Sequence, residues 1–211
     1  MEGEDEQGPD LELNDVSFVG PPPDDDEVLE RLPAELAGLL RQVNGFIQFG
    51  GGLHVRGACL GPPWHSLRDA WDGEHAFHRH YPNVRPGDVP FAEDCLGDQF
   101  LLRDGAVLRL RAETGELEAK GQDLFGFLRA AQADPRGSLS LEPLIRFERE
   151  GGELEPGQLL AAYPPFCTSE AADGVRLAAV PADERRRSLA VLAARIRDVP
   201  DGVSIVFRVA P

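Results

Sequence analysis

Histidines are the first candidates for chemistry in this chain of 211 residues, because three of its five histidines lie within six positions. The group comprises His75, His78 and His80, with His65, Asp72 and Glu74 nearby. Neutral imidazoles and a carboxylate are suitable zinc ligands, and His75 and His78 would share one face of a helix. His80 would point elsewhere, and the spacing matches no zinc motif. We therefore expect a polar surface loop without a bound metal.

Adjacent carboxylates at Glu93 and Asp94 suggest the acid pair of a hydrolase. Because successive residues of a strand point to opposite faces, these two side chains could not flank one scissile bond. We expect them to end a strand and to shape the turn before Gly97. An alternative role is recognition of a basic partner by an acidic rim that would also include Asp98, Glu113 and Glu116. Turn formation and solvation are the competing interpretation of each carboxylate.

Trp64 and Trp71 complete the set of residues that we predict to bind a partner. Tryptophan is enriched among interface anchors, although packing in or near the core is the competing interpretation. The one compact basic cluster is Arg185-Arg186-Arg187. It lacks a wider basic face with interleaved aromatic residues, so direct nucleic-acid binding is not expected. We predict a solvated helix face, paired with Asp183 or Glu184.

Signatures of catalysis and of cofactor binding are absent from the sequence. Gly50-Gly51-Gly52 precedes a strand-like segment, so it presents no helix N-terminus to a phosphate. No Gly-x-Ser-x-Gly elbow occurs. The three cysteines, Cys59, Cys95 and Cys167, are widely spaced and odd in number, which argues against a disulfide framework or a zinc ribbon. We therefore expect a non-catalytic protein that needs no cofactor.

Most of the acidity lies at one end of the chain. The formal net charge is -16, but residues 1–30 contain twelve Asp or Glu and no Lys or Arg, which leaves 25 acidic and 21 basic residues elsewhere. This segment has few large apolar residues with which to order itself. We predict a mostly disordered tail at 1–27 and a single domain at 28–211. Within the tail, a short strand or a clip onto the domain could form from Leu11, Leu13, Val16 and Phe18.

The sequence also bears on location. It contains neither a secretory signal nor an apolar run long enough to span a membrane. We therefore predict a cytoplasmic protein with no membrane partner, and the sequence leaves its oligomeric state open.

The pair Asp104-Gly105 is the strongest structural signal. It suits a two-residue type I′ turn, whose central residues both need positive φ, between strands at 100–103 and 106–110. Such a turn would place Leu102 opposite Val107 and would bring apolar residues to both faces of the ribbon. We therefore expect this hairpin to be covered on both sides.

Helices and strands follow one another irregularly along the chain. Apolar residues at helical spacing predict helices at 36–43, 124–131 and 189–199, and a helical stretch between 66 and 80. Other apolar or alternating runs predict strands at 46–49, 53–56, 117–120, 175–180 and 203–209. The segment 144–149 fits a short helix or a strand. This order predicts an α+β fold, with a mainly antiparallel twisted sheet and helices packed against it.

Several short motifs carry a family resemblance. They are Val89-Pro90-Phe91-Ala92-Glu93-Asp94, Gly97-Asp98-Gln99-Phe100, Asp104-Gly105 and Glu113-Thr114-Gly115-Glu116, with Leu32-Pro33, Asn44-Gly45, Tyr163-Pro164-Pro165-Phe166 and Pro200-Asp201-Gly202 outside them. Together they resemble the SUKH superfamily (Smi/Knr-like) over residues 32–209. The resemblance implies a SUKH-like domain.

The resemblance also implies a function. Bacterial members of the SUKH superfamily look like immunity proteins that bind and neutralise a cognate polymorphic toxin. A nuclease is the natural toxin class, because nucleases carry positive surfaces for phosphate binding. The alternative is a scaffold or regulatory module of the same fold that recruits cellular proteins.

Overall fold

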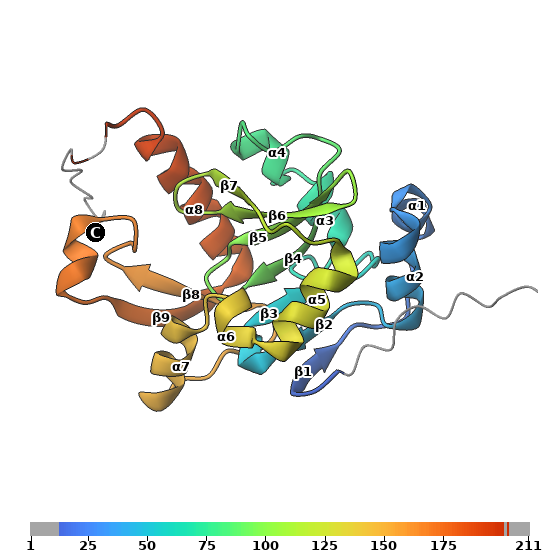
Figure 1. Cartoon of the computed structure of the whole chain (residues 1–211), viewed down its shortest axis with the longest axis horizontal. Helices are drawn as coiled ribbons and strands as arrows, with labels where there is room; N and C mark the ends of the chain where they lie inside the picture. The colour runs from blue at the N-terminus through green and yellow to red at the C-terminus, as the bar shows by residue number, and fades with distance from the viewer. Residues whose placement is uncertain (1–12, 201, 203–211) are drawn as a thin grey trace, which may run out of the picture.

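The structure is a computed structural model that describes residues 13–200 and 202 (Figure 1). Leu11 and the strand predicted at 203–209 lie outside the described residues. The largest element is an antiparallel sheet of seven strands, each paired with its neighbours in sequence. In chain order the strands are β1 (Val16–Val19), β2 (Phe46–Gln48), β3 (Leu53–Val55), β4 (Val89–Asp94), β5 (Gln99–Arg103), β6 (Ala106–Arg111) and β7 (Glu116–Ala119).

Helices and a second, smaller sheet surround these strands (Figure 1). The helices are α1 (Asp26–Arg31), α2 (Ala34–Gln42), α3 (Leu67–Trp71), α4 (Phe77–His80), α5 (Leu124–Ala133), α6 (Pro135–Ser138), α7 (Glu142–Arg149) and α8 (Ala182–Ile196). The second sheet is a hairpin of β8 (Gln158–Tyr163) and β9 (Arg176–Pro181), and 3-10 turns lie at η1 (Phe49–Gly51) and η2 (Ser169–Asp173). The predicted α+β class with a mainly antiparallel sheet is confirmed.

The β5–β6 hairpin forms as its turn residues predict. Asp104 and Gly105 have φ values of 51° and 79°, and Leu102 lies opposite Val107. Because neighbouring residues of β5 point to opposite faces, Leu102 enters the larger core and Leu101 enters a second one. Helices cover both faces of this hairpin, as expected.

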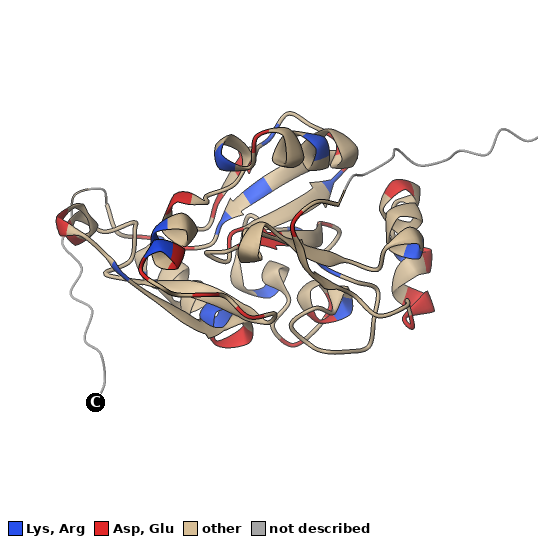
Figure 2. Ribbon diagram, turned by 90° about the horizontal axis from the view of Figure 1, so that it is seen from below, with Lys and Arg blue, Asp and Glu red and all other residues tan. Residues whose placement is uncertain are grey.

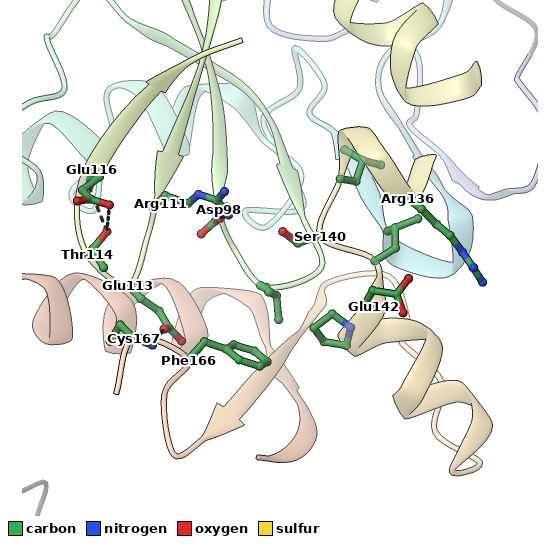
Figure 3. Close-up of a pocket in the computed structure, with 14 residues that line it drawn as sticks. Asp98, Arg111, Glu113, Thr114, Glu116, Arg136, Ser140, Glu142, Phe166 and Cys167 are labelled. Carbon is green, nitrogen blue, oxygen red and sulfur yellow. Dashed lines mark hydrogen bonds and ion pairs between the residues drawn. The ribbon is translucent and has the colours of Figure 1, made fainter. Parts of the chain in front are cut away.

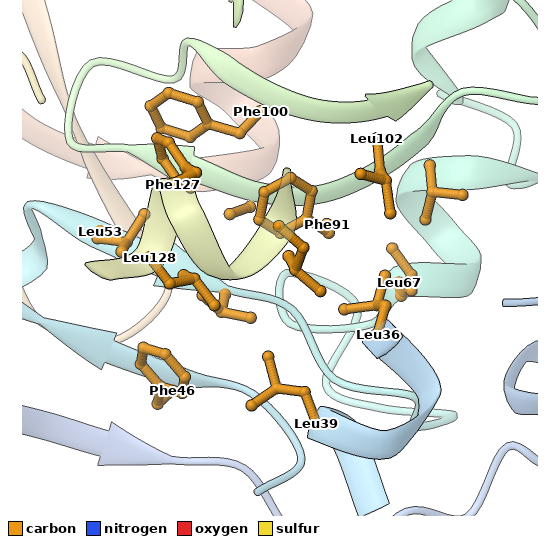
Figure 4. Close-up of a cluster of buried hydrophobic side chains, with 14 of the residues drawn as sticks. Leu36, Leu39, Phe46, Leu53, Leu67, Phe91, Phe100, Leu102, Phe127 and Leu128 are labelled. Carbon is orange, nitrogen blue, oxygen red and sulfur yellow. The ribbon is translucent and has the colours of Figure 1, made fainter. Parts of the chain in front are cut away.

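Two hydrophobic cores therefore lie on opposite faces of the sheet. The larger core packs α2 and α5 against the central strands and includes Leu36, Phe91, Phe100 and Phe127 (Figure 4). The Phe100 and Phe127 ring centroids are 4.4 Å apart. In the smaller core, Leu101 packs with residues of α4 and α8. The last described helix, α8, is thus part of the packed sheet.

Several helix boundaries differ from the sequence-based expectations. The helical stretch expected between 66 and 80 is two short helices, α3 and α4, that are separated by a turn at Gly73. A Cβ at Gly73 would lie 2.4 Å from the backbone oxygen of Asp69, so the chain passes too close here for a larger residue. The segment 144–149 is helical and belongs to α7, and α8 begins earlier than expected, at Ala182.

Part of the acidic segment belongs to the fold. Val16 and Phe18 lie in β1, which pairs with β2 at one edge of the sheet. Asp25 is the N-cap of α1 and accepts a hydrogen bond from the backbone N–H of Val28 at 3.1 Å. The same carboxylate binds the Arg68 guanidinium at 2.5–2.6 Å. Residues 13–27 therefore contribute a strand, a helix cap and a partly buried ion pair.

Among the described helices, none combines the length and the apolar character that crossing a membrane requires.

Candidate functional site

One groove gathers three residues that the sequence analysis assigned to partner binding, namely Asp98, Glu113 and Glu116 (Figure 3). The groove has a volume of about 530 Å³. Its walls come from the β4–β5 turn, the β6–β7 turn, the start of α7 and the segment after β8. Glu113 and Glu116 lie at one end and Glu142 at the other, with Phe166 between them (Figure 3). We call this cavity, lined by the acidic residues Asp98, Glu113, Glu116 and Glu142 together with Phe166, Arg111 and Arg136, the acidic groove.

Asp98 lines the acidic groove, and its carboxylate is already neutralised. It accepts hydrogen bonds from Arg109 Nε at 3.0 Å and from the backbone N–H of Ala112 at 2.8 Å. Arg111 Nη1 approaches the same carboxylate at 3.4 Å. Because the side chain is only 10 % exposed, Asp98 holds the turns together and adds little net charge for a partner.

Glu113 connects three separate segments. Its carboxylate accepts a hydrogen bond from the backbone N–H of Cys167 at 2.9 Å, in the segment after β8. Arg185 of α8 donates to the other carboxylate oxygen at 3.5 Å. Burial and the nearby Glu113 raise the pKa of the Cys167 thiol to about 11. At neutral pH this thiol is protonated, which is the wrong state for a nucleophile.

The outer edge of the acidic groove is exposed and mixes charge with aromatic surface. Glu116 and Glu142 are exposed, and Glu142 has no ion-pair partner among the described residues. Phe166 lines the groove and is 39 % exposed. Two carboxylates and one large aromatic ring are thus accessible along this groove.

Glu93 does not belong to any exposed rim. It is fully buried and binds His54 Nδ1 at 3.0 Å, Arg56 at 2.9 Å and Arg186 Nε at 2.9 Å. Burial acts to raise the pKa of Glu93, but Arg186, Arg56 and His54 together hold it well below its usual range. The carboxylate is the internal counter-charge of two arginines, so the expectation that it would be solvated at a strand end is wrong.

Asp94 is also fully buried, on the opposite side of the same strand. It binds Arg109 at 2.6 Å and accepts hydrogen bonds from the backbone N–H groups of Leu96 and Asp98 at 3.0 and 3.1 Å. Burial and the neighbouring Asp98 raise the pKa of the Asp94 carboxyl to about 7. The predicted turn-forming role is confirmed. Asp94 and Glu93 lie in different networks, as expected for adjacent strand residues.

The two tryptophans have different environments. Trp71 is 6 % exposed, donates through Nε1 to the backbone oxygen of Pro86 at 2.9 Å and packs beneath Arg31. It is a core residue, the alternative that the sequence left open. Trp64 is half-buried, and its ring packs against His54 and Phe18, with centroids at 5.4 and 5.1 Å.

Trp64 also lines a groove of about 820 Å³ between α8 and the α3–α4 region. We call this cavity the α8 groove. His75 and His80 lie in its wall with ring centroids 6.1 Å apart, and His78 does not line it. Within residues 13–200 and 202, no cluster of three or more His, Cys, Asp or Glu is arranged to hold a metal ion.

The basic cluster on α8 is not a solvated face, so that prediction is wrong for two of its three residues. Arg185 is buried against Glu113, and Arg186 reaches Glu93. Only Arg187 makes the predicted exposed pair, with Asp183 at 2.9 Å. The burial of Arg185 could have been predicted, because Arg185 is four residues before Leu189 and therefore lies on the apolar face of the helix.

Comparisons with models of protein families, with curated proteins and with solved structures give no match to this chain. The site is therefore interpreted from its own geometry. Acidic and basic residues are interspersed along the described elements (Figure 2). Many are paired internally, whereas Glu116 and Glu142 of the acidic groove are exposed.

Proposed function

We propose that this chain is a non-catalytic immunity-type protein that binds a cognate toxin domain and neutralises it. The observation that carries the proposal is the acidic groove, in which Glu113, Glu116 and Glu142 surround an exposed Phe166. Carboxylates near an exposed aromatic ring suit a protein surface rich in Arg or Lys. Such groups give charge complementarity, and the ring supplies an anchor.

A nuclease domain is the toxin class that fits this surface best. Nucleases bind phosphate through clustered Arg and Lys, and a protein that covers those residues blocks access of the substrate. The proposed place of action is the cytoplasm, where a toxin directed at nucleic acid would meet its target.

The chemistry of the groove supports binding rather than catalysis. Asp98 is bound by Arg109 and Arg111, and burial keeps the pKa of the Cys167 thiol at about 11. A general base or a nucleophile needs a group with a free lone pair near neutral pH. These two groups lack that property, whereas exposed Glu116 and Glu142 are suited to pairing with a partner.

The test is co-expression with the toxin encoded beside this gene, followed by co-purification. We expect the wild-type chain to rescue growth and to co-purify with the toxin. The double substitution Glu116→Lys/Glu142→Lys should weaken affinity by at least about tenfold, since each reversal replaces an attraction by a repulsion. The control is Glu30→Lys/Glu35→Lys, which makes the same charge change at exposed positions of α1 and α2.

A wild-type chain that neither rescues growth nor co-purifies with the toxin would contradict the immunity function. Equal binding by the two double variants would contradict the acidic groove as the binding surface and leave the immunity function standing. The alternative function, a scaffold or regulatory module, predicts capture of a cellular protein and a gene with no toxin gene beside it.

A further inference from the structure

A chain of three polar contacts crosses the interior beneath β1. Glu93 Oε1 contacts His54 Nδ1 at 3.0 Å, and His54 Nε2 contacts His65 Nδ1 at 2.9 Å. His65 Nε2 in turn contacts the backbone oxygen of Asn44 at 3.0 Å. All three separations are hydrogen-bond distances, and the two histidines are at most 5 % exposed.

The two neutral imidazoles carry fewer N–H protons than the three contacts between Glu93, His54, His65 and Asn44 require. A carbonyl oxygen and an ionised carboxylate only accept hydrogen bonds, and a neutral imidazole carries one N–H. His65 must therefore hold its proton on Nε2 to reach the Asn44 oxygen, and His54 must hold its proton on Nδ1 to reach Glu93. The lone pairs of His54 Nε2 and His65 Nδ1 then face each other. Three contacts share two protons.

The position of His65 is fixed by glycines on three sides. A Cβ at Gly20 or at Gly57 would lie 2.5 or 2.6 Å from His65 Nε2, and one at Gly45 would lie 2.6 Å from His65 Cε1. Phe18 closes another side with its ring centroid 5.0 Å away. The imidazole cannot move away from His54 without displacing backbone, so the unfavourable contact is held in place.

Burial, with the neighbouring arginines, explains why the third proton is not already bound at neutral pH. Charged groups that face the pair are Glu93 on β4, Arg56 directly after β3, Arg186 on α8 and, across a narrow cavity, Glu155 before β8. Two arginines already compensate the Glu93 carboxylate. Burial lowers the pKa of His54 to about 4 against the opposing effect of Glu93, and burial lowers that of His65 as well.

We propose that His54 and His65 form a buried proton-binding site that is one proton short at neutral pH and takes up that proton as the pH falls. The proton comes from water, binds between His54 Nε2 and His65 Nδ1, and changes the charge of the pair from 0 to +1. The added charge favours the His54–Glu93 contact and repels Arg186, which is bound to the same carboxylate.

Hydrogen bonds link the His54–His65 site to the segment after β1 and to helix α8. Asn44 donates to the backbone oxygen of Pro21 at 2.8 Å and accepts from the backbone N–H of Ala58 at 2.7 Å, which holds the segment after β1. Arg186 attaches α8 to Glu93 and to the backbone oxygen of Trp64 at 3.0 Å. Proton uptake therefore acts on the attachment of α8 to the sheet, including the wall of the α8 groove that contains Arg186.

Nitrogen-15 NMR of histidine-labelled protein tests this site, because imidazole nitrogen shifts report the tautomer and the charge. At about pH 7.5 we expect two neutral rings, with the proton of His54 on Nδ1 and that of His65 on Nε2. On acidification both rings should change together, as one proton is shared. A charged ring at pH 7.5, a His54 proton on Nε2, or independent titration near roughly pH 6.5, the ordinary value, would overturn the proposal.

Two substitutions refine the test. Glu93→Gln supplies an amide N–H to His54 Nδ1, so the three contacts have three protons and the His54 proton moves to Nε2. The pair should then no longer bind an additional proton on acidification. The control is His75→Gln, at an exposed histidine outside these contacts, which should leave the tautomers of His54 and His65 unchanged. If Glu93→Gln does not fold, the wild-type tautomers at pH 7.5 still decide the question.

Discussion

At the scale of single residues, Glu93 links charges from distant parts of the chain. Arg56 is completely buried, and burial lowers the pKa of its guanidinium to about 9 although Glu93 opposes the shift. Its Nε has no hydrogen-bond partner among the described residues, whereas its terminal nitrogens bind Pro90, Glu93 and Gln99. Arginine retains its charge in such places better than lysine, because its intrinsic pKa is higher. The pair is a buried structural ion pair.

Acid should weaken the fold through His54. Its folded pKa is about 4, below the ordinary histidine value of 6.5, so the unfolded chain binds more protons between those pH values. The stabilisation is present above pH 6.5 and is lost as the pH falls toward 4. Between pH 7.5 and 5 we expect a loss of about 2 kcal/mol from this group alone.

Urea denaturation at several pH values, compared between the wild type and His54→Gln, isolates that contribution. Other groups, including Asp94, titrate in both proteins and cancel in the difference. The wild type should lose stability with acid more steeply than the variant. Parallel pH profiles would show that His54 does not contribute.

At the scale of elements, glycines determine how closely β1, β3 and the loop around His65 can approach. A Cβ at Gly57 would lie 2.6 Å from the backbone oxygen of Asn44 and from His65 Nε2. We expect Gly57→Ala to lower the free energy of unfolding by about 1–3 kcal/mol through this overlap. Gly38, in the middle of α2, has nothing within 4 Å of its Cβ position.

Gly38→Ala is therefore the matched substitution with the opposite expected sign. It should raise the free energy of unfolding by about 0.5–1 kcal/mol, because alanine is the better helix former. Thermal or urea unfolding of both variants measures the two effects. A neutral Gly57→Ala variant would mean that the loop around His65 relaxes.

Elements with local signals could be predicted from the sequence. The β5–β6 hairpin depends on two turn residues, and Asp123 caps α5 by accepting from the backbone N–H of Gly126, as its position predicted. The strand expected at 175–180 is present as β9. The break between α3 and α4 was missed because it depends on close backbone packing at Gly73.

The candidate site could be predicted only in part, for a physical reason. Asp98, Glu113 and Glu116 do meet in one groove, and turn chemistry placed them near one another in sequence. The partners of Glu93 are Arg56 and Arg186, which are 37 and 93 residues away. No local pattern encodes contacts at such separations, so burial of these carboxylates required the fold.

At the scale of the whole molecule, charge is distributed unevenly along the sequence. The formal net charge is -16, and residues 1–12 alone contain six acidic residues. Long-range attraction between an acidic chain and a basic partner raises the association rate and weakens as salt increases. For the proposed toxin complex, we expect a chain without residues 1–12 to show a smaller loss of association rate with added salt.

Stopped-flow association at salt concentrations from about 0.05 to 0.3 M measures this dependence. The dissociation rate should be similar in the two chains, because the acidic groove is intact in both. Identical salt slopes would contradict a role of the N-terminal acids in steering.

The sequential order of the seven strands has a consequence for synthesis. Each strand from β2 to β7 pairs with the strand made just before it, so the sheet can grow in the order in which the ribosome releases it. Contacts close in sequence form quickly. Arg186 belongs to α8 and is synthesised long after Glu93. A nascent chain therefore contains Arg56 and Glu93 before Arg186 can bind the Glu93 carboxylate. Docking of α8 adds Arg186 to the Arg56–Glu93 pair, so this buried network is completed late in folding.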